Sequence, residues 1–592
     1  MMTKTFTRKK IFVCSIILFV VFILLITRLS YLMIVRSDYY YEKANALHQR
    51  ERSIKAKRGV IYDRNGVELA GNKPVCSISV IHSQITDEAS VVAVLSDVLD
   101  IPEDKVREKV EANTIREKIK SNVEKETADI IRDKNLDGVM VDEDYKRYYP
   151  YDTLASKVLG FTGSDNQGIV GLEVSYDDIL SGKPGSILTL TDANGIEIKN
   201  EAEGRIEPIP GNDLYTTIDI NIQKYAEQAA QKVYKSKQAK RVSVILMNPQ
   251  NGEIYAMVNV PEYNLNEPYK LNYKKTTKMT DKEMQDALNM MWRNFCINDT
   301  YEPGSTFKTV TAAAALEENV VKVDDTFNCP GFRVVEDRKI RCARTTGHGT
   351  ETFRQGIMNS CNPVFIDVGA RVGVDRMYKN FEKLGLFEKT GIDLPGEANS
   401  IMHKKENVGA VELATISFGQ SFQITPMQLL RAISAIVNGG KLITPHFAMC
   451  SVNNITQEKK MFEFKESPGT IRKETSDTMK ELLEAVVAEG GGSKGQVPGY
   501  RIGGKTATSE KLPRGNRKYI SSFMGFAPAN NPQIVGIIMI DEPVGTYYGG
   551  TIAAPVMAEI YENILPYLGI EADYSEEKIK ETMSGIYIEE GD

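Results

Sequence analysis

The chain has 592 residues, too many for one compact core, so about two to four domains are expected. Apolar residues make up 42% and charged residues 26%, which is the composition of an ordinary globular protein. The net charge is only -6 and no long basic run is present, which argues against nucleic acid as a partner.

A long apolar stretch lies near the N-terminus. Residues 11–27 carry no charge, and after Arg28 the apolar run continues to Val35. A bilayer requires about 20 residues of helix, whereas a cleaved signal peptide usually has an apolar core of about 7–15 residues. We therefore predict a cytoplasmic tail at 1–10 and a retained transmembrane helix at 11–35; a buried helix of a soluble domain is the alternative. By the positive-inside rule the rest of the chain lies outside, because cations precede the apolar run at Lys4, Arg8, Lys9 and Lys10.

The next region, residues 36–210, changes character several times. Residues 56–72 predict a strand and a hairpin turn, because Asn65-Gly66 supplies the positive φ angles of such a turn. Residues 85–145 are charge-rich and have helical periodicity, and residues 147–182 are rich in glycine and aromatic residues. The turn-rich sequence near 205–215 marks the predicted end of this region.

Residues 211–568 predict an α+β domain. A short strand and an amphipathic helix open it, and a β-hairpin follows over residues 242–260. Helical patterns occupy 305–318 and 410–438, and two further strands flank an Asn-Asn-Pro turn near 530. Strands at both ends of a helical middle predict an antiparallel sheet that joins distant segments and is flanked by helices. Residues 569–592 are acidic and are predicted to be a tail.

The first candidate catalytic element is Ser305-x-x-Lys308. Pro303 and Gly304 break the preceding structure and an alanine-rich run follows, so Ser305 is expected in the first turn of a helix with Lys308 on the same face. A serine nucleophile needs an adjacent base, and a lysine can serve if burial and neighbouring cations lower its pKa. Alone, the pattern is common on surface helices.

The second element is Ser360-Cys361-Asn362. In an extended turn, Ser360 and Asn362 point the same way and Cys361 points away from them. Ser360 could then relay a proton from Lys308 and Asn362 could bind a substrate amide. Alone, this sequence is an ordinary Asn-Pro turn.

The third element is the run Gly503–Ser509. Two glycines allow close approach of the backbone before a segment of strand character. Lys505 and the hydroxyls of Thr506 and Thr508, which share one strand face, could hold a substrate carboxylate. Alone, the run is a glycine turn leading into an exposed edge strand.

The three elements in this order form a known set of penicillin-binding proteins and class A β-lactamases. Over nearly its whole length after the apolar stretch, the chain resembles a class B penicillin-binding protein of the division or spore-cortex type. Residues 58–66 and 147–173 resemble the elongated pedestal, or dimerisation, domain of that family. Resemblance to its transpeptidase domain is carried by TTIDINIQ (216–223), MNPQNGEIYAM (247–257), FGQSFQITPMQ (418–428) and SFMGFAP (522–528).

This resemblance implies a membrane-anchored peptidoglycan D,D-transpeptidase that cross-links stem peptides outside the cell membrane. Ser305, activated by Lys308, would attack the D-Ala-D-Ala stem peptide and would also be acylated by β-lactams. The backbone N–H groups of Ser305 and Thr508 would form the oxyanion hole. The implied catalytic residues are Ser305, Lys308, Ser360, Asn362 and Lys505, and the implied substrate-binding residues are Thr506, Ala507 and Thr508. A membrane-embedded glycosyltransferase is the implied partner, and the chemistry requires no cofactor.

One position departs from the family pattern. Ala507 stands where the third motif normally has glycine. Our hypothesis is that the added methyl group narrows the substrate groove or twists the strand and so slows acylation by β-lactams.

A candidate metal site lies in the same region. Cys329, Cys342, His348 and Cys361 fall within 33 consecutive positions, and three thiolates with one imidazole are a structural zinc set. The spacing is wider than in a usual zinc knuckle, but glycines near Cys329 and His348 allow tight turns. The alternatives are a Cys329–Cys342 disulfide or unconnected core cysteines.

Two other functions remain as alternatives to the transpeptidase. A β-lactam-hydrolysing or sensing enzyme could share the same serine fold, although no carboxylate in the sequence is an evident activator of a deacylating water. A non-catalytic scaffold for a cell-wall glycosyltransferase is the other alternative, which the departure at Ala507 keeps open. A Ser-His-Asp hydrolase is not expected, because no His-Asp pattern lies near Ser305.

Overall fold

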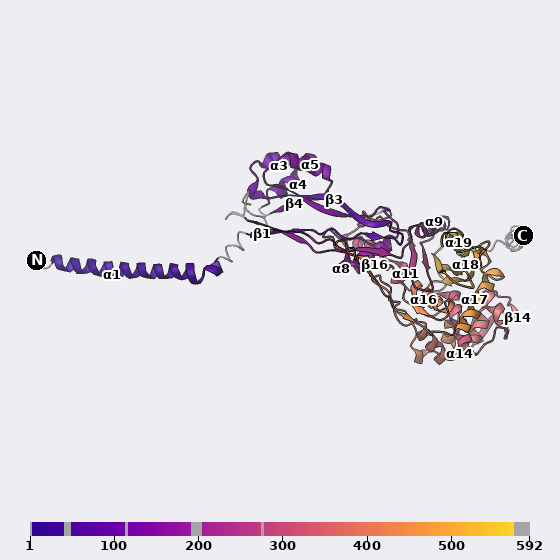
Figure 1. Ribbon diagram of the computed structural model, residues 1–592. Helices are drawn as coiled ribbons and strands as arrows, with labels where there is room; N and C mark the ends of the chain where they lie inside the picture. The colour runs from indigo at the N-terminus through magenta and orange to yellow at the C-terminus, as the bar shows by residue number, and fades with distance from the viewer. Residues whose placement is uncertain (1–2, 41–48, 113–115, 191–203, 274–277, 573–592) are drawn as a thin grey trace. The chain divides into compact units, whose positions relative to one another are not determined.

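The computed structural model describes residues 3–40, 49–112, 116–190, 204–273 and 278–572 (Figure 1). Helix α1 spans Thr3–Ser30 and continues in the π-helical turn η1, Tyr31–Val35. Residues Lys9–Val35 are long and apolar enough to cross a membrane, with a mean hydropathy of 2.9 and no residue buried by the protein. This is the segment predicted to span the bilayer. Most of the predicted acidic tail, residues 573–592, lies outside the described residues.

The chain forms two compact units, each assembled from three separate segments. The first comprises residues 1–57, 73–146 and 182–210, and the second comprises 58–72, 147–181 and 211–592. This division differs from the predicted boundary at residue 210. Segments 58–72 and 147–181 belong with the long C-terminal segment because their apolar side chains, such as Ile61 and Leu172, are buried in the same core as Phe307.

The first unit contains a three-stranded sheet and the last strands of a larger sheet of seven strands. In the larger sheet, β3 (Glu68–Val80) pairs with β4 (Glu117–Val123) and β5 (Val139–Tyr148). The helices predicted over 85–145 are present as α3 (Glu88–Leu99), α4 (Glu103–Val110) and α5 (Lys125–Asp133), but the strands β4 and β5 were not predicted. Only Ile119 and Val123 of β4 are buried, so its charged residues hide the strand pattern. The other sheet joins β1 (Gln49–Ile54), β6 (Gly185–Leu190) and β7 (Gly204–Ile206).

The second unit is built around a five-stranded antiparallel sheet in the order β10-β9-β21-β20-β19. Its strands are β9 (Arg241–Met247), β10 (Ile254–Val260), β19 (Gly503–Glu510), β20 (Tyr519–Ala527) and β21 (Ile534–Asp541). The sheet therefore joins segments about 250 residues apart in sequence, as predicted, and β19 is its edge strand.

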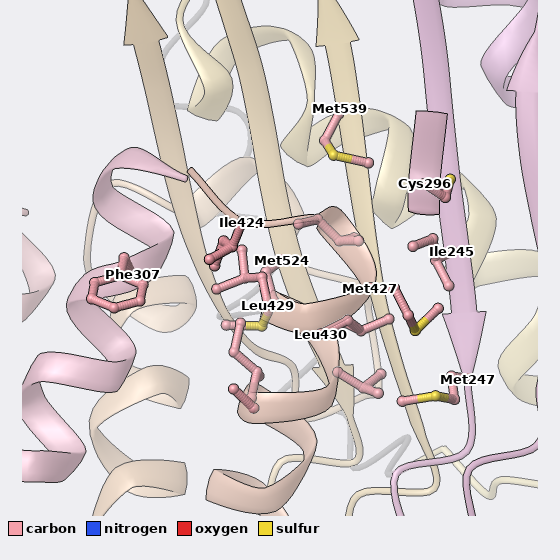
Figure 2. Packing of buried hydrophobic residues seen from close by; sticks show 14 of the residues in the cluster. Ile245, Met247, Cys296, Phe307, Ile424, Met427, Leu429, Leu430, Met524 and Met539 are labelled. Atoms are coloured by element: carbon pink, nitrogen blue, oxygen red, sulfur yellow. The ribbon is translucent and has the colours of Figure 1, made fainter. Parts of the chain in front are cut away.

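Alternate residues of these strands enter two different cores. Ile245 and Met247 of β9 pack in the larger core, whereas Val244 and Leu246 pack in the smaller one, because successive side chains of a strand point to opposite faces. The larger core includes α16 (Pro426–Val437), and Figure 2 shows Leu430 of this helix among the methionines of the sheet. The smaller core includes α9 (Ile220–Ser236), α18 (Gly549–Ile552) and α19 (Ala554–Tyr567).

The helical pattern predicted over 410–438 is divided into two helices. α15 (Ala410–Ile416) is separated from α16 by a turn in which Ser421 has a φ of 68°. Thr425 begins α16 with a capping box, in which its hydroxyl accepts the Gln428 N–H and the Gln428 side chain accepts the Thr425 N–H. The capping box at Thr425 thus starts a new helix, although the apolar periodicity of the sequence is continuous.

Further helices and strands complete the second unit. Its further helices are α6 (Ser156–Leu159), α7 (Gly171–Ser175), α8 (Asp177–Leu180), α10 (Asp281–Trp292), α11 (Phe295–Asn298), α12 (Lys308–Glu317), α13 (Phe353–Met358), α14 (Asn362–Lys383) and α17 (Lys473–Ala488). Its further strands are β2 (Ile61–Tyr62), β8 (Asp213–Thr216), β11 (Thr326–Cys329), β12 (Phe332–Val335), β13 (Arg338–Arg341), β14 (Gly349–Thr352), β15 (Leu442–Ile443), β16 (Ala448–Val452), β17 (Lys459–Met461) and β18 (Glu466–Ser467).

The segments 58–66 and 147–173, which carry part of the family resemblance, meet at the buried carboxylate of Glu173 in the second unit. Arg58 Nε donates to Glu173 Oε2 at 2.7 Å, and Arg147 Nε donates to Glu173 Oε1 at 2.6 Å. Arg58 also binds Asp177 at 2.7 Å. Removal of Glu173 would leave two buried cations without their shared partner, a change that usually costs about 3–5 kcal/mol. The cluster therefore ties residues 58–66 to residues 147–177.

The half-buried carboxyl of Glu227 on α9 gives the free energy of unfolding a pH dependence. Burial, reinforced by the negative charge of Glu262, raises the pKa of Glu227 from 4.5 to about 7. The folded state therefore holds a proton that the unfolded chain releases, and this stabilisation is present below about pH 4.5 and is lost as the pH rises through 7. We expect Glu227→Gln to raise the Tm by about 1–2 °C at pH 8 and to leave it nearly unchanged at pH 4.5. Thermal melts at the two pH values test this, and an equal change at both would contradict it.

Candidate active site

The candidate nucleophile lies in a tight turn that leads into a buried helix. Residues Gly304–Phe307 form a 3₁₀ turn, η3, and α12 begins at Lys308. The sequence predicted the first turn of an α-helix, and the tighter turn follows from Gly304, whose φ is 57°. A side chain there would also come within 2.2 Å of Ser509 Oγ. Ser305 is half-buried, and Lys308 is only 1% exposed.

The structure brings both other motifs to Lys308. Its Nζ donates to Asn362 Oδ1 at 2.7 Å, to the Ser360 carbonyl oxygen at 2.6 Å and to Ser360 Oγ at 3.2 Å. Lys505 Nζ donates to the same Ser360 Oγ at 2.9 Å. Ser360 therefore links two amines that are 197 positions apart in the sequence.

The two amines have lowered proton affinities. Burial lowers the pKa of Lys308 from 10.5 to about 8. Burial, together with the positive charge of Lys308, holds the pKa of Lys505 well below its usual range. A neutral amine can accept a proton, and Lys308 follows Ser305 by three residues at the start of α12, so Lys308 is the candidate base for Ser305.

The second motif adopts a different backbone from the predicted extended turn. Ser360 has a φ of 52°, in the left-handed region, and Asn362 is the first residue of α14. Ser360 and Asn362 nevertheless both face Lys308. Cys361, the residue between them, is fully buried.

The third motif forms the edge strand β19, and its side chains alternate as predicted. Lys505 and Ala507 are buried, whereas Thr506 and Thr508 are half-buried. Thr508 Oγ1 accepts a hydrogen bond from the Gly549 N–H at 2.9 Å. The two threonine hydroxyls therefore share one strand face.

The four candidate metal ligands converge behind the second motif. The ligand atoms of Cys329, Cys342, His348 and Cys361 all lie within 4.8 Å of one another. In a tetrahedral zinc site a thiolate sulfur and an imidazole nitrogen lie about 3.6 Å apart, and Cys342 Sγ is 3.7 Å from His348 Nδ1. All the cysteines are free thiols, so the alternative Cys329–Cys342 disulfide is absent.

Short strands and glycine turns position these ligands. Cys329 ends β11 and His348 precedes β14, the strand paired with it, so that the His348 N–H donates to the Cys329 carbonyl oxygen at 3.1 Å. Gly331 and Gly347 have φ angles of 93° and 85°, and a side chain at either would collide with backbone atoms. These are the tight turns that the sequence predicted for a small metal loop.

The Cys/His cluster is connected to the second motif through hydrogen bonds that the sequence did not predict. Asn362 Nδ2 donates to the carbonyl oxygen of Arg341, the residue before Cys342, at 3.0 Å. Glu351 is buried beside His348, and its Oε2 accepts a hydrogen bond from Asn359 at 2.9 Å. The cluster therefore braces Asn359 and Asn362, the residues on either side of Ser360 and Cys361. The only sequence signal for Glu351 was its place three residues after His348.

Comparisons with known proteins agree with this arrangement. Residues 242–562 match the family model of the penicillin-binding protein transpeptidase domain, and residues 53–216 match that of the penicillin-binding protein dimerisation domain. The chain belongs to the penicillin-binding protein family. It is 38% identical to stage V sporulation protein D of Bacillus subtilis, over 95% of this chain and 86% of that relative. It is 30% identical to a probable peptidoglycan D,D-transpeptidase, PenA, of Neisseria meningitidis serogroup A, over 93% of this chain and 91% of that relative.

A solved structure shows the same fold for a penicillin-binding protein. Penicillin-binding protein 2X of Streptococcus thermophilus superposes with a TM-score of 0.72 at 22% identity, over 89% of this chain and 82% of that one. The predicted family and the predicted α+β fold are both confirmed.

The side chain of Ala507, the residue that departs from the family pattern, is buried in the protein and does not face an open groove. Ala507 is 3% exposed, and its Cβ lies 3.6 Å from the position that a Cβ on Gly304 would occupy. We expect Ala507→Gly to speed penicillin acylation by roughly two- to fivefold, the factor that about 0.5–1 kcal/mol in the barrier gives, because it removes the methyl group that lies buried near the turn that carries Ser305. Acylation reactions quenched at successive times and analysed by intact-mass spectrometry measure this rate. An unchanged rate would show that the methyl group has no such effect.

Proposed function

We propose that this protein is a peptidoglycan D,D-transpeptidase that works through an acyl-Ser305 intermediate. The observation that carries the proposal is the pair of low-pKa amines, Lys308 and Lys505, on the hydroxyl of Ser360, with Lys308 three residues after Ser305 at the start of α12. The similarity to named D,D-transpeptidases over more than nine-tenths of the chain supports it.

The geometry supports the following sequence of proton transfers. Lys308 takes the proton of Ser305 Oγ as the oxygen attacks the penultimate carbonyl of the stem peptide. Ser360 passes a proton from Lys308 to the departing amine as the peptide bond breaks, and D-alanine leaves. An amine of a neighbouring stem peptide then attacks the acyl carbon, and its proton returns through Lys308 to Ser305.

Other residues of the site bind and orient the donor peptide. Lys505 and the hydroxyls of Thr506 and Thr508 hold its terminal carboxylate, and the Asn362 amide holds a backbone amide. The N–H groups of Ser305 and Thr508 receive the developing oxyanion. Ala507 packs behind this strand. β-Lactams acylate Ser305 by the same attack.

Incubation of the full-length protein with penicillin, read by intact mass, tests this proposal. We expect one covalent penicillin on the wild type and none on Ser305→Ala, with equal melting temperatures for the two. Rapid turnover of the penicillin would favour the hydrolase alternative, and a wild type without adduct would favour the scaffold.

We further propose that the Cys329, Cys342, His348 and Cys361 cluster holds one structural zinc ion. Three thiolates and one imidazole within 4.8 Å of one another are a closed zinc ligand set with no open position for substrate. The ion would take no part in the chemistry. It would stabilise the loop whose Arg341 carbonyl oxygen accepts the Asn362 hydrogen bond.

We also propose that the first helix anchors the protein in the cell membrane with the catalytic unit outside. The cluster of Lys and Arg residues before the apolar run supports this orientation. Labelling of a cysteine introduced at Lys57 by a membrane-impermeant maleimide in intact cells tests it. A membrane-embedded glycosyltransferase is the proposed partner, and cross-linking in membranes tests that assignment.

A further inference from the structure

A β-hairpin adjoins the second motif of the proposed active site. Its strands β12 and β13 pair antiparallel, and its last residue, Arg341, precedes Cys342 of the Cys/His cluster. The Arg341 carbonyl oxygen accepts a hydrogen bond from Asn362 Nδ2 at 3.0 Å, and Asn362 Oδ1 accepts one from Lys308 Nζ at 2.7 Å. The hairpin is therefore only two hydrogen bonds away from the proposed catalytic base.

One face of the hairpin packs against the rest of the second unit. Val335 and Ile340 are partly buried against the larger core, and Arg333 pairs with Asp367 of α14. Successive side chains of a strand point to opposite faces, so the residues that alternate with these three point away from the core. The outer face of the hairpin therefore consists of four residues: Phe332, Val334, Lys339 and Arg341.

The cations on and beside this outer face are unpaired. Lys339 and Arg341 are exposed, and so is Arg344, in the loop that follows Cys342. Within the described residues, none of these three side chains makes an ion pair. The acidic residues of the hairpin lie at 336–337, in the turn at its other end. The outer face therefore carries a net positive charge at the end that adjoins the second motif.

Apolar groups accompany these cations. Val334 is 55% exposed and lies opposite Lys339, while Phe332 is half-buried and lies opposite Arg341. The Lys339 Nζ lies 3.8 Å from the centroid of the Phe332 ring. A polyphosphate would pair with the cations and leave the apolar groups uncovered, whereas a peptide can present both carboxylates and apolar side chains. The outer face is therefore better matched to an anionic peptide.

We propose that the outer face of this hairpin, together with Arg344, binds the carboxylates of the acceptor stem peptide. The proposal rests on the proposed function, in which the acceptor nitrogen bonds to the acyl carbon, the bond from that carbon to Ser305 Oγ breaks, and the amine proton returns to Ser305 through Lys308. Because Lys308 contacts both polar residues of the second motif, the acceptor amine approaches from that side, where the hairpin lies. The planar guanidinium groups of Arg341 and Arg344 suit bidentate pairing with carboxylates.

Binding to the penicillin-acylated full-length protein tests this proposal, because penicillin then fills the donor site. The probes are the tripeptide L-Ala-γ-D-Glu-L-Lys and the same peptide with both carboxylates converted to carboxamides; neither can act as a donor. We expect the carboxylate peptide to bind about tenfold more tightly, the factor that about 1.4 kcal/mol gives. Raising the salt concentration from about 0.05 M to about 0.5 M should reduce this preference, because the cations are exposed.

The double variant Lys339→Gln, Arg344→Gln should abolish the preference for the carboxylate peptide. Arg341 is retained, because its carbonyl oxygen holds Asn362. The matched control is Lys224→Gln, Lys235→Gln, which removes the same charge from two exposed lysines of α9, one of which lies over the ring of Tyr151. The control should keep the preference. Intact mass verifies that each protein carries one penicillin before the peptides are added.

Equal affinities of the wild type for the two peptides would overturn the proposal. So would a decrease of the same size for both peptides in the double variant, which is the result of a purely structural role. Tighter binding of a glycerol phosphate oligomer than of the carboxylate peptide would overturn it as well and assign the face to an anionic wall polymer. Failure of penicillin to acylate wild-type Ser305 would instead overturn the proposed function, so the two failures are distinguishable.

Discussion

Lys308→Met lowers the rate of Ser305 acylation by penicillin by about 10²–10⁴-fold, the contribution that a positioned base usually makes. Lys308 is buried, its pKa is lowered to about 8, and its amine contacts both Ser360 and Asn362. Methionine keeps the length and the apolar part of the side chain but cannot accept the serine proton. The measurement is the time course of covalent adduct formation, followed by intact-mass spectrometry. The wild type and the variant are compared at the same protein concentration and the same penicillin concentration.

The control for this prediction is Lys473→Met, which removes an exposed lysine of α17 and should leave the acylation rate unchanged. A melting temperature of Lys308→Met close to that of the wild type shows that the active site is still folded. A decrease in rate of less than tenfold would mean that another group accepts the proton of Ser305.

Removal of zinc is expected to have the second large effect. Purified protein should contain about one zinc per chain, and a chelator should lower the Tm by about 5 °C or more, because the binding free energy of a structural zinc is also folding free energy. The chelated protein should also acylate more slowly, since Asn362 loses the fixed Arg341 carbonyl oxygen that orients it. Metal analysis, thermal melts and adduct formation with and without chelator measure the three effects.

Two cysteine variants separate a metal effect from a simple loss of packing. Cys361→Ser should lose zinc, whereas Cys450→Ser, at a buried cysteine of β16 outside the cluster, should retain it. Well under half an equivalent of zinc in every preparation of the wild type would contradict the metal site.

Local patterns were sufficient for most of the regular elements. The hairpin at β9 and β10, the helix α9 and the strands β20 and β21 all follow from periodicity and from turn residues. The strands β4 and β5 were missed because charged residues obscure their alternation. The division between α15 and α16 was missed because apolar periodicity continues through residues 410–438, and only the backbone at Ser421 and the cap at Thr425 show the break.

The candidate site was predicted residue by residue, together with a relay from Lys308 through Ser360, but its other hydrogen bonds were not predicted. The order of the three motifs indicated Ser305, Lys308, Ser360, Asn362 and Lys505. Nothing in that order shows that Ser360 Oγ accepts hydrogen bonds from both lysines, or that Glu351 holds Asn359 beside the Cys/His cluster. Such contacts depend on loops that meet only when the chain has folded.

The sequence by itself determined the membrane-spanning candidate, the family and the residue types of the site, because apolar length and motif order are properties of the chain in one dimension. Only the tertiary structure decided that segments 58–72 and 147–181 join the second unit and that the Ala507 methyl group lies buried near Gly304. The physical reason is that burial, electrostatic pairing and cavity shape depend on distances between residues far apart in sequence, and no local pattern specifies those distances.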